Sequence, residues 1–75
     1  MERLIEILEE LQPGVDFNTA ENLVDGRILD SLTILSLIAE IEDEFDVEIP
    51  TVEIIPSNFN SAKSIWALIE KQKED

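Results

Sequence analysis

One segment of this chain has more apolar surface than a single helix of a small protein can bury. Residues 31–45 contain no Gly or Pro, and Asp30 or Ser31 can serve as the N-cap of a helix there. At 100° per residue, with Leu32 at zero, one apolar stripe falls between about 140° and 240°. It consists of Ile34, Leu37, Ile38, Ile41 and Phe45. We expect this stripe to face the core of an all-α protein.

A second apolar strip lies on the same segment, between about 300° and 0°. We call it the docking strip, and it consists of Leu32, Leu35 and Ala39. Because a helix in a small bundle buries one stripe, we expect the docking strip to be partly exposed, flanked by Glu42 and Asp43. An exposed apolar strip with an acidic rim is typical of a protein-docking surface. The alternative is that loop residues such as Phe17 or Leu29 cover it.

The remaining residues predict a four-helix bundle with three main helices and one short one. Apolar residues recur at helical spacing in Leu4, Ile5, Leu8 and Leu11, and again in Ala62, Ile65, Trp66 and Ile69. The segment 12–30 is too apolar for disorder, so we expect it to pack across the helix ends. The other expected elements are a first helix over 2–11, a turn or short helix over 51–55, a loop over 57–60 anchored by Phe59, and a last helix over 61–73.

Composition limits the chemistry that this chain can perform. Seventy-five residues indicate a single domain over 1–75, and nine Leu, eleven Ile and four Val are enough for a compact core. The absence of Cys and His excludes a disulfide framework, a thiolate zinc site, a cysteine nucleophile and an imidazole base. No apolar run reaches membrane-spanning length and the acidic N-terminus is unlike a signal peptide, so we expect a soluble, cytoplasmic monomer without membrane insertion.

Acidic residues dominate the charge of the chain. Eighteen Asp and Glu against five Lys and Arg give a net charge of −13, which disfavours nucleic acid and anionic lipid as partners. No basic residue stands between Arg27 and Lys63. That interval contains Asp30, Glu40, Glu42, Asp43, Glu44, Asp46, Glu48 and Glu53. The run is either a solvated face that keeps the protein soluble or a surface that steers a basic partner.

Ser31 is the residue best placed to carry a modification. It lies beside the docking strip, at about 260°, and at the positive end of the helix dipole, where phosphate esters are favoured. Considered locally, the Asp-Ser pair is equally consistent with ordinary N-capping. Without a His to activate it, Ser31 is not a self-sufficient nucleophile.

The residues around Ser31 resemble the acyl and peptidyl carrier proteins. Leu29-Asp30-Ser31-Leu32 is similar to the attachment motif of that family, and the similarity continues through Leu37, Glu42 and Glu44 into Phe45-Asp46-Val47-Glu48-Ile49-Pro50. It covers about residues 23–69. The resemblance implies an acyl-carrier-like four-helix bundle whose second helix begins at the Asp-Ser pair. It also implies a carrier without enzyme activity of its own.

The same resemblance implies roles for individual residues. Ser31 would bear 4'-phosphopantetheine, transferred from coenzyme A by a phosphopantetheinyl transferase, and an acyl- or aminoacyl-activating ligase would load the arm with a thioester for a downstream acyltransferase or synthase. Asp30 would help to position coenzyme A phosphates and metal in the transferase complex. The partner-recognition face would consist of Leu32, Leu35, Ala39, Glu42 and Asp43.

The sequence also resembles one subgroup of these carriers more specifically. Fatty-acid carriers usually have acids at the positions of Thr33 and Ser36, so the second helix starts with less negative charge here. The stretch from Ser31 through 59–65 is similar to the D-alanyl carrier proteins of Gram-positive cell-wall modification, whereas the segment ending at Pro50 is more like ordinary acyl carriers.

Two other functions are consistent with the residues alone. An unmodified acidic helical module would use the docking strip as a groove for a partner. A calcium-binding protein would use Asp43, Glu44, Asp46 and Glu48, but the EF-hand spacing fails because Glu48 and Ile54 stand where Gly and Glu are required. We therefore expect no metal site.

Overall fold

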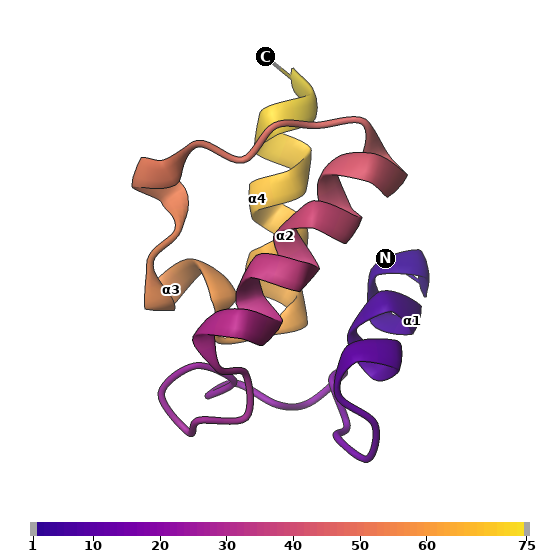
Figure 1. Cartoon of the computed structure of the whole chain (residues 1–75), viewed down its shortest axis with the longest axis vertical. Coiled ribbons are helices and arrows are strands. Elements are labelled where there is room, and N and C mark those ends of the chain that lie inside the picture. Colours follow the sequence, from indigo (N-terminus) through magenta and orange to yellow (C-terminus); the bar gives the residue numbers. More distant parts are fainter. Residues whose placement is uncertain (1, 75) are drawn as a thin grey trace.

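A computed structural model describes residues 2–74, and every regular element in that range is helical. Three long helices are α1 (Glu2–Leu11), α2 (Ser31–Phe45) and α4 (Ala62–Glu74). Between α2 and α4 lie a 3-10 turn, η1 (Thr51–Glu53), and the short helix α3 (Pro56–Phe59). Helix α1 packs against both α2 and α4, and α3 packs against α4 (Figure 1). The predicted all-α fold with three main helices and a short one is confirmed.

The short helix α3 corrects the loop expected over 57–60. Pro56 occupies the first turn, where its missing N–H costs nothing and its fixed φ suits a helix. Phe59 is buried, as predicted, and anchors the helix. The last helix begins at Ala62 instead of Ser61, because Ser61 stands just outside it and its hydroxyl accepts a hydrogen bond from the Ser64 N–H at 3.1 Å.

The core is formed by one face of each long helix. On α2 the side chains of Leu37, Ile38 and Ile41 are buried, and Ile34 and Phe45 pack against them while half-buried. The predicted core stripe is therefore confirmed. Two further core residues, on the helices that flank α2, lie outside the apolar positions named from the sequence. They are Ile7 on α1 and Leu68 on α4.

The long segment between α1 and α2 packs beneath the ends of the helices, as expected (Figure 1). Its residues Phe17, Leu23 and Leu29 are buried in the same core. These three side chains anchor the segment to the bundle, although the segment contains no helix or strand. Among residues 2–74, none of the helices has the length and apolar character needed to cross a bilayer.

Candidate functional site

The first turn of α2 is fixed by Asp30. Its backbone is extended, with φ −90° and ψ 177°, and its Oδ1 accepts a hydrogen bond from the Thr33 N–H at 2.8 Å. This backbone hydrogen bond stabilises the ionised form and lowers the pKa of Asp30 below its ordinary value of 3.8. Asp30 is therefore the N-cap, and Ser31 is the first helical residue.

Ser31 is left free by this arrangement. Its side chain is exposed, and within residues 2–74 its hydroxyl has no side-chain hydrogen-bond partner. Because Asp30 caps the helix, the Ser31 oxygen is not needed to satisfy the first N–H groups of α2. The hydroxyl therefore combines accessibility with the positive end of a 15-residue helix.

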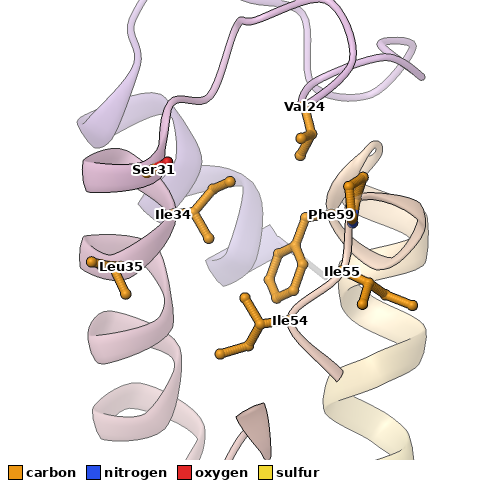
Figure 2. A pocket seen from close by; sticks show the side chains of 8 residues that line it. Val24, Ser31, Ile34, Leu35, Ile54, Ile55 and Phe59 are labelled. Atoms are coloured by element: carbon orange, nitrogen blue, oxygen red, sulfur yellow. The ribbon is translucent and has the colours of Figure 1, made fainter. Parts of the chain in front are cut away.

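An apolar cavity of about 310 Å³ opens beside Ser31. Figure 2 shows Ile34, Ile54 and Phe59 converging in it, with Val24 at one end and Ser31 on the first turn of α2. The remaining lining residues are Leu35, Ile55 and Pro56. Apart from the Ser31 hydroxyl, the lining side chains are hydrocarbon, so the cavity favours an apolar occupant.

The docking strip is exposed on the outer face of α2. Leu32 is 76% exposed and Leu35 is 60% exposed, and Ala39 is exposed as well. The alternative that Phe17 or Leu29 covers the strip is wrong, because both side chains are buried in the core. A strip of this kind leaves its apolar area available to a partner.

The two acids expected beside the docking strip differ in their surroundings. Asp43 is exposed, as a partner contact requires. Glu42 is only half-exposed, and its Oε2 accepts a hydrogen bond from the Ile49 N–H at 2.9 Å. Glu42 thus also holds the chain where it leaves α2, a role that sequence spacing did not indicate.

Sequence reasoning missed two exposed apolar residues that lie outside the docking strip. Val52 on η1 is 79% exposed, and Ile55, which lines the cavity, is 46% exposed. Ile55 lies across the cavity from α2 (Figure 2). The bounding prolines indicated a short element there, but only the fold places that element opposite Ser31.

The acids of the calcium alternative do not converge, since residues 2–74 contain no group of three Asp or Glu placed to hold a metal ion.

The model of a family described as "phosphopantetheine attachment site" matches residues 2–69. The chain belongs to this family. It is a carrier protein, and its prosthetic group is covalently attached 4'-phosphopantetheine. Proteins of this kind are generally not enzymes and work together with phosphopantetheinyl transferases and ligases.

Curated relatives of this carrier include three streptococcal proteins, each named D-alanyl carrier protein. That of Streptococcus sanguinis is 38% identical over 63 residues, which span 83% of this chain and 80% of the relative. Those of Streptococcus gordonii and Streptococcus thermophilus are 36% identical with the same coverage. No solved structure matches the chain.

The residues at the start of α2 fit the prosthetic group. An attachment serine needs an accessible hydroxyl, and the Ser31 oxygen is accessible because Asp30 performs the capping. The phosphate of the group is an anion, which the N-terminus of α2 favours. Nothing in the first turn of α2 opposes the attachment sterically, since both Ser31 and Leu32 are exposed.

The cap at Asp30 predicts a pH dependence of stability. The pKa of Asp30 is lowered in the folded state, so its ionised form adds stability above about pH 3.8 that is lost as the pH falls through the lowered folded value. Asp30→Asn keeps a cap oxygen but does not titrate. We expect the difference in unfolding free energy between the wild type and Asp30→Asn to be constant near neutral pH and to shift against the wild type in acid. Urea unfolding at a series of pH values measures it, and a difference independent of pH would contradict the prediction.

Proposed function

We propose that this carrier bears its 4'-phosphopantetheine on Ser31 and shuttles an acyl or aminoacyl group between partner enzymes. The observation that carries the proposal is the exposed Ser31 residue at the start of α2, whose hydroxyl has no hydrogen-bond partner among residues 2–74 and lies beside both the apolar cavity and the docking strip. In the attachment reaction the Ser31 Oγ would form the new bond to phosphorus. The pyrophosphate bond of coenzyme A would break to release adenosine 3',5'-bisphosphate, and the hydroxyl proton would pass to a base of the transferase.

The surrounding residues support this role. When bound, the group supplies a terminal thiol that holds its cargo as a thioester. Asp30 keeps Ser31 at the helix start, and its exposed carboxylate would help to position coenzyme A phosphates and metal in the transferase complex. The docking strip, together with Asp43 and Glu42, would guide basic surfaces of partner proteins. These partners would be a phosphopantetheinyl transferase, an activating ligase and a downstream acyltransferase or synthase.

Further parts of the proposal concern the molecule as a whole. Residues 1–75 would form one carrier domain that acts as a cytoplasmic monomer and has no enzyme activity of its own. Its net charge of −13 supports the absence of nucleic acid and membrane lipid among its partners. Weak, brief contacts suit a carrier that must leave each partner, and a small exposed strip provides them.

Ser31→Ala should abolish coenzyme A-dependent modification without unfolding the protein. Ser31 is exposed and does not cap α2, so we expect a change in unfolding free energy within about 0.5 kcal/mol. Intact mass after incubation with coenzyme A and a broad-specificity transferase measures the modification. Ser57→Ala, which removes another exposed serine, is the control and should be modified like the wild type. An unmodified wild type would favour the alternative of an unmodified interaction module.

Leu35→Glu should impair transfer far more than it impairs stability. Leu35 is 60% exposed, so a charge there costs little in folding but interrupts the apolar centre of the docking strip. We expect the transferase kcat/KM to fall by about tenfold, corresponding to roughly 1.4 kcal/mol of lost transition-state binding. Leu37→Ala, in the buried stripe of the same helix, should instead cost about 2–5 kcal/mol of stability. If Leu35→Glu unfolds the protein, the docking strip belongs to the core.

A second, narrower candidate is a D-alanyl carrier of teichoic acid modification. The identity of 36–38% to streptococcal proteins of that name favours it. Thr33 and Ser36 support it too, because the first turns of α2 are less acidic than in fatty-acid carriers. The cavity beside Ser31, whose lining side chains carry no charge to pair with the ammonium of an alanyl thioester, is the feature that an alkyl cargo would use better.

Loading experiments distinguish these cargoes. The modified protein, incubated with D-alanine, ATP and a D-alanine-activating ligase, should gain the mass of one alanyl group that hydroxylamine releases. Ser31→Ala is the control and should gain none. L-alanine under the same conditions tests the selectivity of the reaction. Loading by a fatty-acyl-activating ligase in place of the D-alanine ligase would contradict the D-alanyl assignment and leave the wider carrier function intact.

A further inference from the structure

Asn60 directly follows α3, and its hydrogen bonds reach the loop that precedes α2. Its Oδ1 accepts hydrogen bonds from the backbone N–H groups of Val24 and Asp25, both at 3.0 Å. Its Nδ2 donates to Asp25 Oδ2 at 3.0 Å, and its backbone oxygen accepts from the Leu23 N–H at 2.8 Å. One residue therefore holds three consecutive loop residues that lie 35 or more positions earlier in the chain.

The residues held by Asn60 lead directly to Ser31. The Leu23 backbone oxygen accepts a hydrogen bond from the Leu29 N–H at 2.8 Å, which closes the loop immediately before Asp30. Leu23 and Leu29 are both buried, so a displacement of one is passed to the other through packed atoms. Val24 lines the cavity beside Ser31 (Figure 2). The loop 23–29 thus sets both one wall of the cavity and the approach to the helix start.

We infer that Asn60 is a positioning residue for the attachment reaction at Ser31, acting by holding the loop 23–29 against the junction of α3 and α4. This inference rests on the proposed function of Ser31. Transfer to Ser31 requires its Oγ to meet the phosphorus of coenzyme A in a defined geometry, and an error of about 1 Å in such a geometry can cost up to about a hundredfold in rate. Loss of the Asn60 contacts frees the loop that fixes this geometry.

The contacts require an amide at position 60. Two N–H groups need an acceptor oxygen, and the Asp25 carboxylate needs a donor, and only Asn offers both at this reach. In Asn60→Asp the acceptor is kept, but the donor is replaced by a second carboxylate facing that of Asp25. Repulsion between the two would loosen the loop. The double variant Asn60→Asp/Asp25→Asn restores a donor and an acceptor with their positions exchanged.

The test measures the transferase kcat/KM for Ser31 modification together with backbone hydrogen exchange. We expect Asn60→Asp to lower kcat/KM by about tenfold or more. The amides of Val24 and Asp25 should exchange about tenfold faster. The double variant should recover kcat/KM to within about threefold of the wild type, because its hydrogen bonds are complementary again.

Ser64→Ala is the matched structural control. The Ser64 hydroxyl bonds to Asn58 and Ser61 at the same junction, and none of its hydrogen bonds within the described residues reaches the loop 23–29. We expect it to lower the melting temperature without slowing the modification. The inference is overturned if Asn60→Asp is modified at the wild-type rate, if the double variant folds and stays as slow as the single variant, or if Ser64→Ala is slowed equally. A wild type that is never modified overturns the proposed function instead.

Discussion

The burial of one face of α2 determines the rest of the site. Leu37 and Ile41 are fully buried, and a helix whose core residues are fixed cannot rotate. Its opposite apolar residues, Leu32 and Leu35, must then face solvent. Ser31 lies at the end of the same outward face, about 100° before Leu32. The accessible hydroxyl and the docking strip are therefore consequences of how the core packs.

The features that depend on neighbouring residues could be predicted from the sequence. The bounds of α1 and α2, the buried stripe and the exposed strip follow from apolar periodicity, and the sequence limits the cap to Asp30 or Ser31, of which the structure uses Asp30. Features that depend on distant contacts could not. Helix α3 needs the burial of Phe59, and the second role of Glu42 needs the approach of Ile49.

The cavity and the Asn60 contacts could not be predicted from the sequence for the same reason. Both join residues that lie about 30 or more positions apart, such as Val24 and Asn60. A sequence pattern carries no information on which loop residue a polar side chain will meet after folding. Val24, in the loop before α2, and Ile54, directly after η1, gave no signal of a shared cavity, because each is an ordinary apolar residue among its own neighbours.

The charge of the molecule contributes little to its stability. The ion pairs of the described residues are Arg3 with Glu6, Arg3 with Glu44, and Lys71 with Glu53. At least one side chain of each pair is more than 40% exposed to solvent, and such pairs contribute at most about 1 kcal/mol each. Stability must come from the apolar core, against the repulsion of unpaired carboxylates. A basic partner surface would relieve that repulsion on contact, so the same charges that weaken the isolated fold favour its complexes.

The start of α2 and the cavity beside it are held by different forces. The core stripe fixes the helix that carries Ser31, whereas the loop 23–29, which leads to Ser31 and provides Val24 as one wall of the cavity, is held by the hydrogen bonds between Asn60 and residues 23–25. Each such bond contributes roughly 1 kcal/mol, so this loop can move without unfolding the core. The loop is therefore the part of the site whose geometry depends on one residue, Asn60, whereas the helix that presents Ser31 is fixed by many packed side chains.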